Sequence, residues 1–115
     1  MTSQLTTHAL DTVRGQGASG LKVDIRRITP EPAELGSAVL GENGRAVLLP
    51  SGELHPGVYE LVFHAADYHR RCGLALTDPP FLDSVAIRFG VAAGTGNYHV
   101  PLLLSPYCYS TYRGN

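Results

Sequence analysis

Apolar and polar residues alternate along most of this chain, in short segments separated by turns rich in glycine and proline. The segment 21–28 is the clearest, because Leu21, Val23 and Ile25 would point to one side of a strand while charged residues point to the other. The remaining candidate strands are 5–12, 34–40, 46–49, 58–64, 84–91, 98–104 and 107–113. Short strands joined by turns in this way predict an all-β fold, an antiparallel β-sandwich.

One segment departs from this pattern. Residues 65–71 read AADYHRR, enough for about two helical turns, and Gly73 suits the C-terminal end of a helix. At 115 residues the chain has the length of one domain, so we expect a single unit over residues 1–115 with its own apolar core.

The composition argues against several classes of partner. The net charge is −1 and Lys22 is the only lysine, so we expect no basic surface for nucleic acid or an anionic membrane. The chain has no apolar run of about 18 residues, which a membrane-spanning helix needs. Its N-terminal segment lacks the basic and apolar regions of a secretory signal, and we therefore expect a cytoplasmic protein. Cys72 and Cys108 are too few for a disulfide framework and are predicted to be buried, reduced thiols.

Two of the five histidines lie in the middle of candidate strands, among apolar neighbours. These are His8 and His99, whereas we interpret the others as solvated surface residues: His55, His64 and His69. Taken singly, His8 or His99 could be a partly buried histidine that only packs. If their strands lie together, the pair could instead serve as general base and acid near neutral pH, because the ordinary pKa of histidine is about 6.5.

The same two histidines do not predict a metal site. A zinc site needs a third protein ligand, and Asp11, the nearest carboxylate in sequence, would face the opposite side of its strand from His8. We therefore predict no bound metal.

Two further polar side chains, Arg45 and Tyr112, stand where a ligand could reach them. Arg45 follows the turn 41–44, whose Asn-Gly pair is typical of a β-hairpin, and could be a solvated charge or a clamp for a planar, oxygen-rich ligand. Tyr112 shares a strand face with Cys108 and Ser110, and could pack locally or bind a ligand through its hydroxyl. The residues alone predict no more than a β-sandwich with a candidate His, Arg and Tyr site.

Several motifs together extend over nearly the whole chain. They are LTTHALDT at 5–12, GENGR at 41–45, PGVYELVF at 56–63, PPFLDSVAIRFGV at 79–91 and YHVPLLLSPYCYSTYRGN at 98–115. With these motifs the chain closely resembles the transthyretin-like family, and within it the branch of 5-hydroxyisourate hydrolases. The closing motif is the most specific. The hydrolases end in a Tyr-Arg-Gly-Ser signature, whereas the thyroid-hormone carriers of the same fold lack this ending and the histidines.

The resemblance implies a fold, an assembly and a reaction. The fold would be a sandwich of two four-stranded sheets with one short helix at about residues 65–71. The assembly would be a homotetramer, a dimer of dimers, with active sites in a central channel. The reaction would be hydrolysis of 5-hydroxyisourate to 2-oxo-4-hydroxy-4-carboxy-5-ureidoimidazoline in urate degradation. The family needs no cofactor and no metal.

Carried onto matching positions, the resemblance implies a site made of His8, Arg45, His99 and Tyr112. His99, together with His8, would activate water for attack on a ring carbonyl and help to protonate the leaving nitrogen. Arg45 would hold the substrate and stabilise the developing oxyanion. Tyr112 would bind the substrate, with Ser110 as a weaker candidate for the same role.

One position departs from the family. Asn115 stands where the hydrolases have serine, so an amide must replace any role of that hydroxyl. Two other functions are compatible with the residues: a non-catalytic carrier of a small ligand, as in the transthyretin branch, and a structural interaction module. The histidine pair with Arg45 favours the enzyme, because a carrier or an interaction module needs neither.

Overall fold

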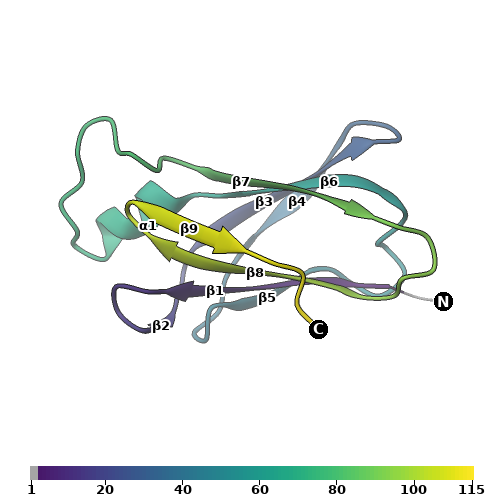
Figure 1. Ribbon diagram of the computed structural model, residues 1–115, viewed down its shortest axis with the longest axis horizontal. Helices are drawn as coiled ribbons and strands as arrows, with labels where there is room; N and C mark the ends of the chain where they lie inside the picture. Colours follow the sequence, from purple (N-terminus) through teal and green to yellow (C-terminus); the bar gives the residue numbers. More distant parts are fainter. Residues whose placement is uncertain (1–2) are drawn as a thin grey trace.

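The computed structural model describes residues 3–115, so Met1 and Thr2 lie outside it. Two β-sheets pack face to face, and one short helix, α1 (Ala65–Arg71), lies at an end of the sandwich (Figure 1). The predicted β-sandwich and the predicted helix are both confirmed. No helix among residues 3–115 has the length and apolar character that a membrane crossing requires.

The first sheet carries the strands that position the candidate site. They are β1 (Leu5–Asp11), β2 (Gln16–Gly17), β5 (Arg45–Leu49), β8 (Tyr98–Ser105) and β9 (Cys108–Thr111). Their order is β2-β1-β8-β9, and β5 pairs with the same edge of β1 as β2 but nearer to the N-terminal end of β1. This sheet is therefore four strands wide, as the resemblance implied, with the two-residue β2 as an addition in the connection between β1 and β3.

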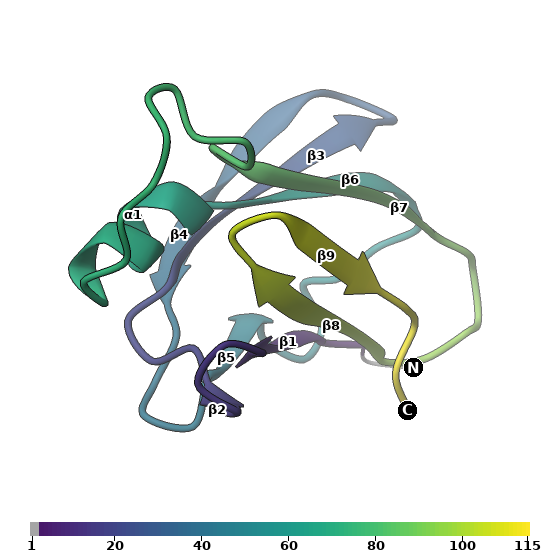
Figure 2. The ribbon, with the colours of Figure 1, turned by 60° about the vertical axis from the view of Figure 1, so that its left-hand side comes forward.

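The second sheet has the order β4-β3-β6-β7. Its strands are β3 (Lys22–Thr29), β4 (Ala33–Val39), β6 (Gly57–Phe63) and β7 (Val85–Val91). Figure 2 shows this sheet and the first as separate layers. The second sheet covers one face of the first and leaves the other face open.

The pairing of β1 with β8 is parallel, and it brings two strands from opposite ends of the chain together. All other strand pairs within residues 3–115 are antiparallel. A parallel pair needs a long crossover connection, which here contains the whole second sheet. This pair departs from the antiparallel arrangement that the sequence predicts, and it places the strands of His8 and His99 side by side.

A β-bulge between β1 and β5 decides which way Arg45 points. Leu5 is opposite Leu49 and Thr6 is opposite Val47, so Leu48 has no partner on β1. The two consecutive leucines, Leu48 and Leu49, are consequently both buried. Beyond the bulge the alternation resumes, and both Val47 and Arg45 are exposed on the outer face.

The core lies between the two sheets. On β1 every second residue from Leu5 to Asp11 is buried, and on β8 the buried set includes Val100, Leu102 and Leu104. These residues belong to one apolar cluster with inward-facing residues of the second sheet, among them Val23, Ile25, Tyr59, Leu61 and Phe63. The residues between the buried ones, including His8 and His99, therefore lie on the open face of the first sheet.

Asp11 ties the end of β1 to the helix. Its carboxylate accepts a hydrogen bond from the Tyr68 hydroxyl at 2.7 Å, and further bonds from the N–H groups of Val13 and Arg14 at 3.0 and 3.1 Å. These donors compensate for burial, since Asp11 is only 1 % exposed. The carboxylate faces away from His8, as predicted, and its contacts are structural.

Two predictions about surface and burial are wrong. His64 is half-buried, and its Nε2 lies 2.8 Å from Asp24 Oδ2, so it is paired with a carboxylate instead of being simply solvated. Cys108 is exposed because it lies on the edge strand β9, while Cys72 is half-buried. Both thiols are free, and His55 is exposed as predicted.

A third prediction, that of a solvated His69, is also wrong. Ala65, Tyr68 and His69 follow the helical spacing i, i+3, i+4 and are buried on the face of α1 that packs on the sandwich. Neither ring nitrogen of His69 has a hydrogen-bond partner within residues 3–115. Burial lowers the pKa of His69, and the negative charge of Asp11 opposes this effect, so the ring is neutral in the folded protein at pH 7.

Replacing His69 with phenylalanine should stabilise the protein and reduce the pH dependence of its stability. The exchange removes an unpaired buried imidazole, and we expect the free energy of unfolding at pH 7 to rise by about 1 kcal/mol. Because the pKa of His69 is lowered in the folded state, the unfolded chain takes up the proton first as the pH falls, and wild-type stability should decline below about pH 6.5. Urea unfolding above and below that pH measures both effects. If acidification lowered the free energy of unfolding of His69→Phe as much as that of the wild type, His69 would not be the cause of the decline.

Candidate active site

Three strands bring polar side chains together on the open face of the first sheet. Between β1 and β8, Thr6 lies opposite His99, and between β1 and β5, His8 lies opposite Arg45. Residues that are paired on neighbouring strands point to the same face. With β1 between β5 and β8, the predicted residues His8, Arg45 and His99 therefore gather in one cluster.

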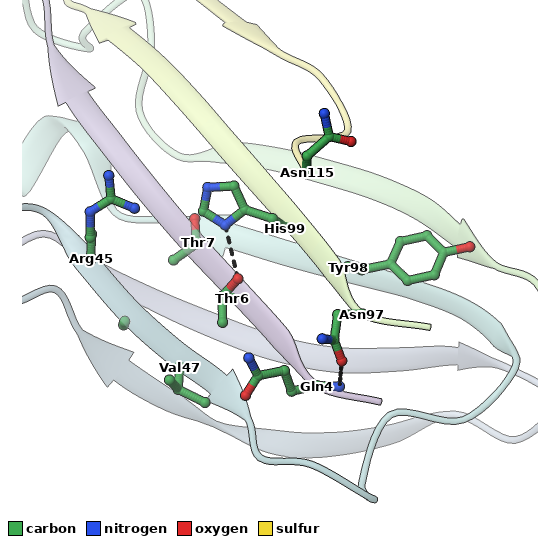
Figure 3. Close-up of a pocket in the computed structure, with 10 residues that line it drawn as sticks. Gln4, Thr6, Thr7, Arg45, Val47, Asn97, Tyr98, His99 and Asn115 are labelled. Atoms are coloured by element: carbon green, nitrogen blue, oxygen red, sulfur yellow. Dashed lines mark hydrogen bonds between the residues drawn. The ribbon is translucent and has the colours of Figure 1, made fainter. Parts of the chain in front are cut away.

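A pocket of about 440 Å³ opens at this cluster (Figure 3). Thr6, Arg45 and His99 line it, together with three carboxamide side chains, those of Gln4, Asn97 and Asn115. The walls thus present an imidazole, a guanidinium, a hydroxyl and several amides. Such a set can bind a small, flat molecule rich in oxygen and nitrogen through hydrogen bonds from several directions.

The turn before β5 docks closely on β1 and so positions Arg45. Gly44 adopts φ +76°, a conformation that favours glycine, and a Cβ there would stand 2.5 Å from the carbonyl oxygen of Ala9. The N–H of Ala9 donates to the carbonyl of Gly44 at 2.9 Å. The N–H of Arg45 donates to Asn43 Oδ1 at 3.1 Å. The Asn-Gly pair of the predicted turn therefore fixes the backbone from which the guanidinium projects.

Contacts from two segments hold the imidazole of His99. Its Nδ1 lies 2.8 Å from the hydroxyl oxygen of Thr6 on β1. In the C-terminal segment, the N–H of Gly114 donates to the carbonyl of His99 at 2.8 Å, and a Cβ at Gly114 would stand only 2.6 Å from His99 Cδ2. A side chain at position 114 would collide with the imidazole, so the C-terminal segment can pack against His99 only with glycine at this position.

The electrostatic surroundings keep His99 neutral. Burial lowers the pKa of His99, and the positive charge of Arg45 and the electrostatic interaction with His8 lower it further, whereas a backbone hydrogen bond to Thr6 opposes these effects. At pH 7 the ring therefore has one nitrogen with a proton and one with a free lone pair. A neutral imidazole next to a guanidinium can remove a proton from water and then return it.

The sequence-predicted Ser110 and Tyr112 lie outside this pocket in a single chain. Ser110 pairs with Leu103 and is exposed on the open face, beyond the pocket. Tyr112 is 60 % exposed and lines a separate pocket of about 260 Å³, where Phe89 of β7 also lies. His8 lies opposite Arg45 but does not itself line the larger pocket.

Gln4, Thr6 and Asn97 line the pocket but are not among the site residues that the sequence predicts. Gln4 precedes Thr6 and His8 by two and four residues, so the alternation of a strand could have placed its side chain on the same face. Asn97 lies just before β8 and carries no such periodic signal. Its Oδ1 accepts the N–H of Gln4 at 3.0 Å, which leaves the Asn97 amide nitrogen as the group able to donate to a ligand.

A β-sandwich with a pocket on the open face of one sheet is the architecture of a transthyretin-like protein. The polar lining of this pocket suits a small, polar ligand. Within residues 3–115 no three histidine, cysteine or carboxylate side chains are grouped so as to hold a metal ion. The family model described as "HIUase/Transthyretin family" matches residues 5–114, and the chain belongs to this family.

Relatives of known name agree with this assignment over nearly the full length. The chain is 50% identical over 115 residues to "5-hydroxyisourate hydrolase 2" of Rhizobium meliloti (strain 1021), covering 97% of this chain and 96% of the relative. Among solved structures, "Structure of Klebsiella pneumoniae 5-hydroxyisourate hydrolase" matches with a TM-score of 0.81 at 30% identity, covering 98% of this chain and 99% of that one. "Crystal structure of (S)-allantoin synthase" matches with a TM-score of 0.93 at 35% identity, covering 99% of this chain but 44% of that one.

Proposed function

We propose that this protein is a hydrolase that opens the ring of 5-hydroxyisourate to give 2-oxo-4-hydroxy-4-carboxy-5-ureidoimidazoline. The observation that carries the proposal is the neutral imidazole of His99, held in a pocket that Arg45 also lines. The name of the Rhizobium meliloti relative supports the choice of substrate. The amides of the pocket support it too, because a cyclic ureide offers both N–H donors and carbonyl acceptors.

In the proposed reaction, His99 acts first as a base. It takes a proton from water while the water oxygen attacks a ring carbonyl carbon, and the carbonyl electrons move onto oxygen. The guanidinium of Arg45 binds this oxyanion. The intermediate then collapses, and the C–N bond breaks. The leaving nitrogen receives the proton from the imidazolium, with the help of His8, and the attacked carbon becomes the carboxyl group of the product.

We further propose that the active protein is a homotetramer, a dimer of dimers, whose sites lie between subunits. The open face of the first sheet supports this, because apolar side chains lie there beside the polar cluster. Val47 is 59 % exposed, and Leu10 and Leu103 are paired and only half-buried. Apolar residues grouped on a face often mark an interface. The cytoplasmic location stays a prediction from the sequence.

Tyr112→Phe should raise KM by about 10-fold if the tetramer brings the tyrosine hydroxyl to the substrate, because one hydrogen bond is lost. Ser110→Ala should have a smaller effect. Steady-state kinetics measure both, and sedimentation velocity establishes that the variants still assemble. If both variants assemble and bind substrate as the wild type does, neither side chain contacts the substrate.

The proposed activity is tested by following the ultraviolet absorbance of freshly made 5-hydroxyisourate. Added protein should speed its decay in proportion to protein concentration. A carrier of the transthyretin kind would bind a small ligand and leave the decay rate unchanged. That result, obtained with folded and assembled protein, would overturn the proposal and favour the carrier.

A further inference from the structure

We propose that Thr6 is a positioning residue, which holds the proton of neutral His99 on Nδ1 and leaves Nε2 as the base that faces the pocket. The proposal rests on the function proposed above and specifies which nitrogen of His99 acts as the base. An imidazole has two unlike nitrogens, and only the nitrogen without a proton can accept one from water. Which nitrogen that is depends on the partner of the other.

The register of the sheet places Thr6 for this role. Thr6 and His99 are directly opposite in the parallel pair β1–β8, and both point to the open face. Across this pair the Thr6 hydroxyl oxygen lies 2.8 Å from His99 Nδ1, the distance of a good hydrogen bond. Figure 3 shows this bond, with the other ring nitrogen directed away from Thr6 and toward the side where Arg45 lies.

The backbone of Gly114 confines the plane of the ring, and the hydrogen bond to Thr6 selects which way round the ring lies. A Cβ on Gly114 would stand 2.6 Å from His99 Cδ2, so the backbone of residue 114 closes the Cδ2 side of the ring. Turning the ring over would carry Nδ1 away from the threonine and give up the hydrogen bond. The ring is therefore bounded on its Nδ1 side by Thr6 and on its Cδ2 side by Gly114, and the Nε2 edge is the one left to the pocket.

The surroundings of the two nitrogens differ in a way that selects the tautomer. Near Nδ1, the hydroxyl oxygen of Thr6 can accept a hydrogen bond from the ring. On the other side, Arg45 offers only N–H donors. A proton on Nδ1 can be donated to the Thr6 oxygen, and the free lone pair is then on Nε2, the nitrogen on the side where Arg45 lies. The reverse tautomer would place its N–H on that side, where the guanidinium also offers only donors.

The tautomer can be observed directly by 15N NMR of the histidine ring in the protein without substrate. At a pH above the pKa of His99, we expect the wild type to carry the proton on Nδ1. Thr6→Ser, which keeps the hydroxyl, should show the same pattern. Thr6→Val, which keeps the shape and removes the hydroxyl, should move the proton toward Nε2. A wild-type proton on Nε2 would overturn the proposal, even if Thr6→Val failed to fold.

Kinetics provide the second measurement. Thr6→Val should lower kcat by about 10- to 100-fold, part of what a general base contributes, while KM changes little. Thr6→Ser should stay within about threefold of the wild type. Thr12→Val is the matched control, because its hydroxyl donates to the carbonyl of Leu104, away from His99. A Thr6→Val variant with wild-type tautomer and kcat would also overturn the proposal, as would a change in KM alone.

The two measurements separate this proposal from the proposed function. If the wild type failed to accelerate the decay of 5-hydroxyisourate, the function would be wrong, and the NMR spectra would still report the tautomer of His99 and its dependence on Thr6. If decay were accelerated but the proton lay on Nε2, the function would stand and the role of Thr6 would be wrong.

Discussion

His99→Gln should lower the rate of catalysed ring opening by about 100- to 10,000-fold, the contribution of a general base. Glutamine keeps a polar side chain that can reach Thr6 and the pocket, but it cannot take a proton from water at neutral pH. Because the pKa of His99 is lowered, wild-type activity should be close to its maximum at pH 7 and should fall only under more acidic conditions, where the ring becomes charged. This acid limb should be absent from whatever activity the variant retains.

His55→Gln serves as the control for this exchange, since His55 lies exposed in a loop away from the pocket. It should keep wild-type activity. The measurement is the initial rate of 5-hydroxyisourate decay across a pH series, with circular dichroism to show that both variants are folded. Wild-type rates in a folded His99→Gln protein would rule out His99 as the base.

Arg45→Ala should lower the rate by about 100- to 1,000-fold, the effect of removing a donor to a developing oxyanion. It should also change the pH profile. The positive charge of Arg45 lowers the pKa of His99, so removing it should raise that pKa and move the acid limb of the profile to higher pH. Arg45→Lys keeps the charge and loses the planar fork, so it should retain the wild-type pH profile at a reduced rate.

Arg70→Ala is the matched control, since Arg70 lies on the exposed side of α1 with only a distant partner, Asp67, at 3.7 Å. It should change neither the rate nor the pH profile. A loss of rate in Arg45→Ala without any shift of the acid limb would mean that His99 is not the group titrating in that limb. An unchanged rate would remove Arg45 from the site.

Much of the fold followed from local pattern. Alternation along the segment 21–28 correctly assigned Leu21, Val23 and Ile25 to one buried face, because a strand has a period of two wherever it lies. The helix at 65–71 was predicted with its observed bounds. Within that helix, the burial of His69 was missed, although Ala65, Tyr68 and His69 have the spacing of one helical face. Histidine as a residue type suggests a surface position, but the position of His69 on the helix decides its burial.

The candidate site was predictable only in part. The motifs pointed to His8, Arg45 and His99, and the structure brings these three together, whereas Tyr112 lies elsewhere in the single chain. The role of Asn97 in the pocket could not be predicted from the sequence. A residue in a turn has no periodicity, and its position depends on where the strand that follows the turn lies in the sheet. A local sequence pattern describes one segment at a time, whereas side chains from several segments line this pocket.

The order of the amino acids is enough to say which side chains leave each strand on the polar face, because alternation follows from backbone geometry alone. Which strands lie side by side, and in which register, is fixed only by long-range contacts in the folded protein. The parallel pairing of β1 with β8 places Thr6 beside His99, and the bulge at Leu48 places Arg45 beside His8. Register depends on contacts between residues far apart in the chain, and a shift of one residue would turn His99 into the core. That long-range choice makes separate polar residues into one candidate site.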